Sequence, residues 1–199
     1  MMASFELAAL LGALRGLTEF WPISSSGHLA LAQTLFNLSD ADRHMSSFLR
    51  IGTLLATIYF LRERLLQLLA ELGLRAIRET TGRDAGRAQD LLFIAVASAP
   101  TAVLGLLLHD SARAWAEEPL AVGFGFLLTG LLLLSSLWAG SGKAPSPTVW
   151  AALIVGIAQG LAILPGISRT GATIVTALWF GVRPERAFEL AMLLGIPTV

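Results

Sequence analysis

Two clusters of hydroxyl and ionisable residues lie within otherwise apolar stretches of the chain. The first, at 19–28, holds a glutamate, three serines and a histidine, and the second holds Ser168, Arg169 and Thr170. Hydroxyls cap the free N–H groups at a helix start, where the macrodipole also favours anions. If two such helix starts converge with Arg169 between them, the pocket suits a phosphate or pyrophosphate.

The two clusters are copies of one pattern, displaced by 144 residues. Positions that match in the two copies are Gly16 and Gly160, Leu17 and Leu161, Ile23 and Ile167, Ser24 and Ser168, and Gly27 and Gly171. Pro22 and Pro165 miss this register by one residue. In each copy a proline breaks an apolar run, a hydroxyl cluster follows, and a second apolar run begins. This pattern predicts a broken helix in each copy.

The composition indicates an integral membrane protein. Hydrophobic residues make up 55% of the 199 residues, charged residues only 14%, and the mean hydropathy is +0.70. The formal net charge of +0 argues against a nucleic-acid partner. Because there are no cysteines, disulfides and zinc–sulfur sites are excluded.

Segment lengths predict which parts span the bilayer, since a spanning helix needs about 20 apolar residues. Segments 89–109 and 119–139 meet this length, whereas 24–37 and 168–181 are too short and suit re-entrant half-helices. We therefore predict an all-α polytopic membrane protein, a single transmembrane domain over 1–199 with inverted-topology repeats and two re-entrant helix–loop–helix segments. Its parts are a first repeat at 1–61 with a re-entrant loop at 20–28, a cytoplasmic amphipathic connection at 62–88, two transmembrane helices within 89–139, and a second repeat at 148–199 with a re-entrant loop at 164–173.

The basic residues predict the orientation. The connection 62–88 carries six arginines, while 38–44 and 110–118 carry one each, so the arginine-rich side is expected to face the cytoplasm. Three expected spanning segments, at 45–61, 89–109 and 119–139, separate the two copies, so the second copy is inverted relative to the first. Such repeats usually build a substrate site near the bilayer midplane.

Several of these residues also have simpler structural interpretations. Arg15 and Glu19 lie one helical turn apart and can form an ion pair. His28 and the hydroxyls can serve packing alone, and the two G-x-x-x-G spacings, at 12–16 and 156–160, favour close helix packing.

Residues 16–29, GLTEFWPISSSGHL, and 165–174, PGISRTGATI, resemble the two signatures of the undecaprenyl pyrophosphate phosphatase family, the bacitracin-resistance proteins. The resemblance implies a multi-pass enzyme of the bacterial inner membrane, with a site that opens to the periplasm. Its reaction would convert undecaprenyl pyrophosphate to undecaprenyl phosphate and inorganic phosphate, which recycles the lipid carrier of peptidoglycan synthesis. It also implies a divalent cation, magnesium or calcium.

Carried over by position, the resemblance gives Glu19, Ser25, His28 and Arg169 catalytic roles. Ser168 and Thr173 match the remaining polar positions of the second signature. The residues that we predict to bind the substrate are Arg15, Ser24, Ser26, Gly27, Gly166, Ser168, Thr170 and Thr173. Ser25 could attack the phosphate while His28 or Glu19 takes its proton. Alternatively Glu19 holds a metal, and water or His28 attacks.

The sequence departs from the family pattern in three places. Arg15 stands where the family has Glu or Gln, so Arg15 could replace the charge of a metal. Ser46 and Arg50 replace an acid and a histidine of a third motif, which makes the expected site more cationic. The sequence ends at Val199, where the family continues through further helices, so we expect either a fragment or a divergent, C-terminally shortened member.

The leading hypothesis is therefore a polyprenyl pyrophosphate phosphatase whose partners are its lipid substrate and the membrane. A transporter or flippase of polyprenyl phosphate is the alternative, since the same inverted repeat suits alternating access. A structural membrane protein is a third and weaker interpretation, given Glu19 and Arg169. A homodimer is among the assemblies that the sequence allows.

Overall fold

The computed structural model describes residues 4–36, 40–75, 85–140 and 142–198, and within them the regular elements are helical apart from one isolated bridge between Ala144 and Val182. The helices are α1 (Ser4–Phe20), α2 (Ser25–Leu35), α3 (Asp40–Phe60), α4 (Arg62–Arg75), α5 (Ala85–Leu107), α6 (His109–Glu117), α7 (Pro119–Ser135), α8 (Val149–Leu161), α9 (Arg169–Trp179) and α10 (Pro184–Gly195), with short 3-10 turns η1 (Ser136–Trp138) and η2 (Ile196–Thr198).

The two sequence copies form two helix–turn–helix units with matching caps. Ser24 Oγ accepts a hydrogen bond from Gly27 N at 3.2 Å, and Ser168 Oγ accepts one from Gly171 N at 3.0 Å. Both serines therefore cap the short helix that follows, as predicted. The short helices α2 and α9 each have 11 residues, and the displacement of 144 residues carries Ser25 onto Arg169 and each end of α2 onto the corresponding end of α9.

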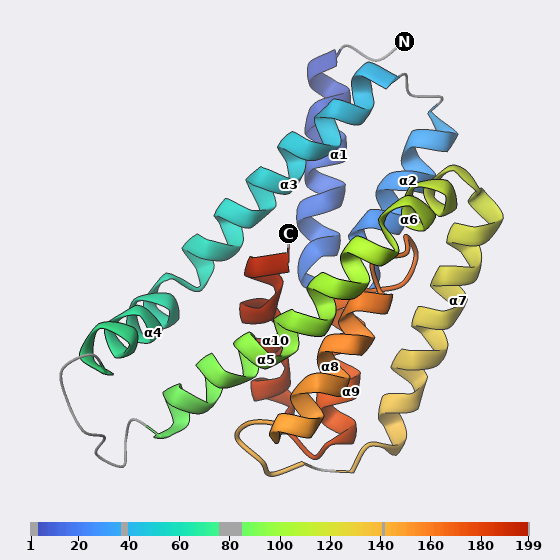
Figure 1. Ribbon diagram of the computed structural model, residues 1–199. Coiled ribbons are helices and arrows are strands. Elements are labelled where there is room, and N and C mark those ends of the chain that lie inside the picture. Colours follow the sequence, from blue (N-terminus) through green and yellow to red (C-terminus); the bar gives the residue numbers. More distant parts are fainter. Residues whose placement is uncertain (1–3, 37–39, 76–84, 141, 199) are drawn as a thin grey trace.

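The two units approach each other from opposite ends of the molecule. In Figure 1, α1 descends from the top and α8 rises from the bottom, and the turns that follow them meet near the middle. We call residues 21–24 the first turn and residues 162–168 the second turn. The turns touch where Gly166 N donates to Ser24 Oγ at 3.1 Å. Ser24 has a φ of 66°, a value that favours glycine, so its two accepted bonds hold a strained backbone.

The main core lies among α5, α8, α9 and α10. Phe93, Val155 and Leu190 are almost fully buried there. Small residues allow the close approach of α5 and α8, since a Cβ built on Gly156 would lie 2.2 Å from Ala97 O. The predicted close packing of this second G-x-x-x-G spacing is therefore confirmed. At Gly16, in the first spacing, a Cβ would meet no atom of the described residues within 4 Å, so the prediction is wrong there.

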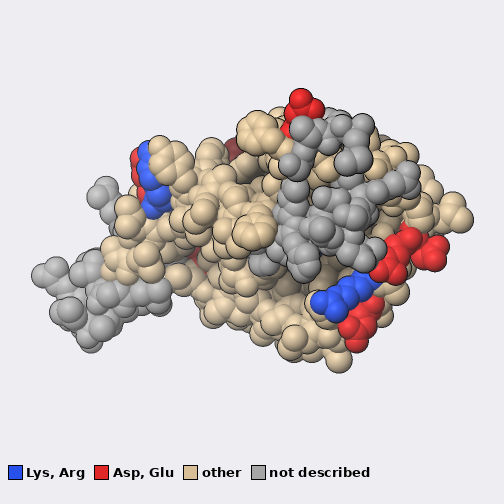
Figure 2. Space-filling model, turned by 90° about the horizontal axis from the view of Figure 1, so that it is seen from above, with Lys and Arg blue, Asp and Glu red and all other residues tan. Residues whose placement is uncertain are grey.

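Long apolar faces of α5 and α7 remain uncovered. Gln89–Leu107 and Pro119–Trp138 are long and apolar enough to cross a membrane, and only 22% and 17% of these segments is buried. They coincide with the predicted spans at 89–109 and 119–139. Figure 2 shows one end of the molecule, where most of the described residues in view are uncharged.

Four charged side chains join α4, α5 and α10 at the arginine-rich end. Asp90 is fully buried and lies 2.5 Å from both Arg64 Nη2 and Arg186 Nη2. Glu189 pairs with the same two arginines. Burial lowers the pKa of Arg186, but its bonds to Asp90 and Glu189 outweigh this effect and raise the pKa overall. We call these four residues the charged cluster.

Some predicted boundaries need correction. The segment 110–118 was expected to be a connection, but α6 occupies most of it because Leu108 N and Ala112 N continue helical bonding past the end of α5. Likewise α3 begins at Asp40, inside the expected connection 38–44. The amphipathic helix expected after residue 62 is α4. Residues 76–84 of the predicted connection 62–88 lie outside the described residues.

Candidate active site

A cavity of about 540 Å³ opens beside the two turns. Its volume is in the range of small-ligand sites. Its polar wall is formed by the end of α1, the starts of α2 and α9, and Arg50 on α3, while α5 and the second turn contribute apolar residues. The sequence-predicted residues that line it are Arg15, Glu19, Ser24, Ser25, Ser26, Ser168, Arg169 and Thr170.

Glu19 is the centre of the polar wall. Its Oε2 accepts a hydrogen bond from Ser25 Oγ at 2.8 Å and lies 3.3 Å from Arg15 Nη2, so the predicted ion pair within α1 is confirmed. Its Oε1 lies 3.4 Å from Arg169 Nη2. One carboxylate thus joins a serine and two arginines from three helices.

Ser25 is the first residue of α2 and is partly exposed to the cavity. Its hydroxyl donates to the carboxylate of Glu19, which is the geometry of a nucleophile beside a general base. The free N–H groups at the start of α2 add a partial positive charge at the same place. Ser25 and Glu19 together can therefore activate an oxygen in an environment that favours anions.

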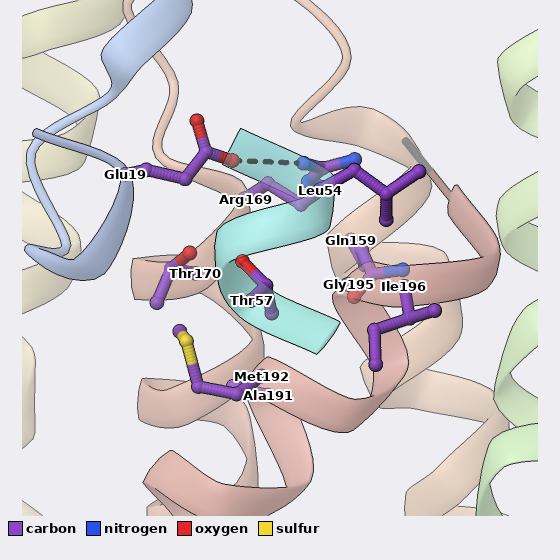
Figure 3. A pocket seen from close by; sticks show the side chains of 10 residues that line it. All are labelled: Glu19, Leu54, Thr57, Gln159, Arg169, Thr170, Ala191, Met192, Gly195 and Ile196. Atoms are coloured by element: carbon purple, nitrogen blue, oxygen red, sulfur yellow. Dashed lines mark hydrogen bonds and ion pairs between the residues drawn. The ribbon is translucent and has the colours of Figure 1, made fainter. Parts of the chain in front are cut away.

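Arg169 is the first residue of α9 and is held from two directions. Its Nη1 donates to Thr198 O at 2.7 Å, and its Nη2 faces Glu19. Figure 3 shows the Glu19–Arg169 pair from the side of a second cavity of about 20 Å³, whose lining includes Thr57 and Gln159. The fixed guanidinium leaves its remaining donors for a ligand.

The second turn is held by α7. Thr129 Oγ1 donates to Gly166 O at 2.7 Å and accepts from Ser168 N at 2.8 Å. Gly166 has a φ of +93°, and a Cβ on it would lie 2.3 Å from Val122 O, so only glycine fits this position. Because Arg169 follows this turn, α7 fixes where its guanidinium lies.

Four sequence-predicted residues lie behind the cavity wall rather than in it. His28 directs Nδ1 to Ser24 O at 2.9 Å, and its ring packs edge-on against Phe126. Gly27 and Gly166 are buried where the two turns touch. Thr173 is buried and donates to Gln159 Oε1 at 2.9 Å. In this arrangement the hydroxyl of Ser25 contacts Glu19, whereas His28 contacts the backbone of Ser24.

The chain matches the family described as bacitracin resistance protein BacA over residues 8–199. A Treponema denticola protein is 38% identical over all of this chain and 73% of its own length. A Korarchaeum cryptofilum protein is 40% identical and a Rubrobacter xylanophilus protein 39% identical, each over 96% of this chain and over 73% and 72% of its own length. All three relatives are called undecaprenyl-diphosphatase.

The chain belongs to the BacA family. The predicted resemblance is thereby confirmed. It rested on the segments 16–29 and 165–174, and these are the segments that form the two turns and the starts of α2 and α9.

The sequence of this BacA-family protein did not lead us to predict a set of hydrogen-bonded polar residues in the cavity wall. Gln159 Nε2 lies 3.4 Å from Thr101 Oγ1 and from Thr198 Oγ1, and all three residues line the cavity. The repeat held the signal, because the displacement of 144 residues places Arg15 on Gln159. Both are buried polar residues on the helix that precedes a turn.

The residues around Glu19 do not fit a divalent cation. Among the described residues, no group of three or more His, Cys, Asp or Glu could hold a metal ion. Magnesium and calcium require several oxygen ligands, and both oxygens of Glu19 are engaged by Ser25, Arg15 and Arg169. The charged side chains that contact Glu19 are the guanidinium groups of Arg15 and Arg169, which cannot bind a cation.

Proposed function

We propose that this protein hydrolyses undecaprenyl pyrophosphate to undecaprenyl phosphate and inorganic phosphate. The observation that carries the proposal is the contact of Ser25 with Glu19 and of Glu19 with Arg169 on the wall of one cavity. A phosphoanhydride needs a nucleophile and fixed positive charge around the phosphoryl oxygens, and these residues supply both. The names of the BacA-family relatives support the same substrate.

The proposed reaction has two steps, and it uses Ser25, Glu19 and Arg169. Ser25 Oγ attacks the terminal phosphorus, the anhydride P–O bond breaks, and undecaprenyl phosphate leaves. Glu19 accepts the proton of Ser25, because its Oε2 already accepts that hydrogen bond at 2.8 Å. Glu19 gives this proton to the departing undecaprenyl phosphate. Water then attacks the phosphoserine, Glu19 takes a proton from the water and returns it to Ser25 Oγ as the bond between that oxygen and phosphorus breaks, and inorganic phosphate is released. Arg169 pairs with the phosphoryl oxygens during both steps.

The apolar wall of the cavity suits the isoprenoid tail. Ala102, Gly105 and Leu106 of α5 line this wall together with Ile163 and Ile167 of the second turn. Leu106 is 82% exposed, so the wall continues onto the outer surface of the molecule. A polyprenyl chain can leave the cavity along α5, while its pyrophosphate remains at Glu19 and Arg169.

The protein is proposed to be a multi-pass protein of the inner membrane. The uncovered faces of α5 and α7 support this placement, because soluble proteins rarely expose apolar patches of this extent. The units α1–α2 and α8–α9 each return to the end of the molecule from which they came, as re-entrant segments do (Figure 1). The repeat is proposed to be inverted, with the second unit oriented opposite to the first.

The distribution of charge supports a site that opens to the periplasm. The end of the molecule with α6 carries Asp110, Glu117 and Glu118, whereas the opposite loops carry Lys143 and Arg183. Arginine-rich ends face the cytoplasm. The cavity lining on α5 extends toward α6, and hence toward the proposed periplasmic side.

The direct test is release of phosphate from a short-chain polyprenyl pyrophosphate by the purified chain in detergent. Ser25→Ala should lower turnover by at least about a thousandfold if Ser25 is the nucleophile. Ser136→Ala, which removes a hydroxyl that donates to Leu133 O and does not line the cavity, serves as the matched control. A Glu19→Ala, Arg169→Ala double variant should release no phosphate. Equal release by the wild-type protein and the double variant would reject the proposed reaction.

A further inference from the structure

Three guanidinium groups gather in the cavity around a single carboxylate. Arg15, Arg50 and Arg169 line the cavity with Glu19, and they come from α1, α3 and α9. Arg50 lies close enough to repel both of the other arginines electrostatically. Like charges brought together in a partly dehydrated site are unfavourable unless an anion joins them. The lining therefore carries an excess of positive charge that Glu19 alone does not balance.

The three arginines differ in the partners that hold them. Arg15 Nε donates to Thr53 at 3.3 Å, and Arg169 donates to Thr198, so both are fixed. Arg50 is exposed to the cavity, and no carboxylate of the described residues pairs with it. An arginine fork matches the geometry of phosphate oxygens, and the group stays charged at all accessible pH values. Arg50 is the cation in this site that a ligand is free to engage.

We propose that the three arginines hold the pyrophosphate in place of a divalent cation, and that Arg50 is a substrate-binding residue. This inference rests on the proposed phosphatase function and concerns the same cavity. It follows from the donor set around Glu19, which does not fit magnesium or calcium. The guanidinium groups supply the positive charge that a metal ion would supply, and they also repel a metal cation electrostatically.

The experiment measures phosphate release from a short-chain polyprenyl pyrophosphate by the full chain, in EDTA and again with added magnesium or calcium. The wild-type rate should stay within about twofold across these conditions. Because Arg50 is exposed, Arg50→Gln should fold normally while raising KM by at least about tenfold. Arg50→Lys should give a smaller rise, since it keeps the charge but loses the fork.

Arg113→Gln is the matched control for loss of one exposed cation. Arg113 lies on α6 and is not among the residues that line the cavity. The KM of the Arg113→Gln variant should therefore equal that of the wild-type protein. A second measurement does not depend on turnover. Inorganic pyrophosphate in EDTA should raise the thermal unfolding temperature of the wild-type protein, and Arg50→Gln should need about ten times more pyrophosphate for the same rise.

Each outcome separates this inference from the proposed function. If EDTA stops phosphate release and magnesium restores it, the phosphatase function stands and the replacement of the metal by arginines is wrong. If Arg50→Gln matches the wild-type protein in KM and in the pyrophosphate titration, Arg50 is not a substrate-binding residue. If no condition gives release, the proposed function fails. Stabilisation by pyrophosphate in EDTA that depends on Arg50 would still support the arginine site.

Discussion

A single methyl group on α7 should test whether the second turn sets the position of Arg169. A Cβ on Gly125 would lie 2.6 Å from Pro165 O and 2.9 Å from Gly166 Cα, whereas a Cβ on Gly123 would meet nothing within 4 Å. Gly125→Ala and Gly123→Ala are therefore the same chemical change at two positions of one helix. Only the first forces α7 away from the second turn.

The size of the effect follows from the contact distances. Relief of the 2.6 Å contact to the 3.4 Å at which ordinary contacts begin requires a movement of 0.8 Å. Such overpacking costs about 1–3 kcal/mol, and the two hydrogen bonds of Thr129 to the turn contribute about 1 kcal/mol each. The higher helix propensity of alanine relative to glycine offsets up to about 1 kcal/mol of this loss. The free energy of unfolding should therefore fall by about 2–4 kcal/mol.

Activity should fall further than stability alone would explain. Arg169 follows the second turn directly, so its guanidinium would move with the turn, away from Glu19 and the phosphate. A displacement of about 1 Å in a positioned group can cost about a hundredfold in rate. We expect Gly125→Ala to lose about that factor in kcat, measured by phosphate release at a temperature where the protein remains folded.

The assay pairs this measurement with thermal unfolding in the same detergent. For a chain of this size, the expected loss of stability corresponds to a lower unfolding temperature by about 5–15 °C. Gly123→Ala should match the wild-type protein in both measurements. If Gly125→Ala also matches it, then α7 does not fix the second turn, and the position of Arg169 has another origin.

Three further substitutions test other parts of the structure. Asp90→Asn should lower the free energy of unfolding by about 2–3 kcal/mol, because the arginines of the charged cluster lose their buried carboxylate partner. The control, Asp110→Asn at an exposed position, should change the free energy of unfolding by less than about 0.5 kcal/mol. Equal unfolding temperatures of the two variants would contradict this prediction. Arg169→Lys keeps the charge but loses the fork, so kcat should fall by about a hundredfold, and near-normal turnover would exclude Arg169 from the site. Gly27→Ala would place a Cβ 2.6 Å from the backbone of the second turn and should lower activity, whereas Gly16→Ala, which fills open space, should not.

The sequence predicted the helices whose ends carry chemical signals. Ser24 and Ser168 were expected to cap short helices, and both do so, because a side-chain oxygen three residues before a free N–H is a local feature. The ion pair of Arg15 with Glu19 was equally local, since one helical turn separates them. Helix α6 was missed because its polar residues looked like a connection.

Contacts between distant segments were harder to predict. Asp90 falls at the edge of an apolar run and was interpreted as part of a span, yet two arginines from other helices neutralise it. Two equal G-x-x-x-G spacings behave differently because α5 lies against Gly156, whereas no described residue outside α1 lies against Gly16. In these cases the partner decides the role, and the partner is set by the tertiary fold.

The repeat explains how one duplicated pattern builds a site with unlike halves. The displacement of 144 residues pairs Ser25 with Arg169, and each is the first residue of its short helix. Both helix starts therefore offer free N–H groups to the same cavity. At the equivalent position, one copy contributes a hydroxyl beside a base and the other contributes a phosphate-binding cation. Glu19 lies between them and contacts both, so the difference between the two copies provides the nucleophile and the charge that the proposed reaction needs.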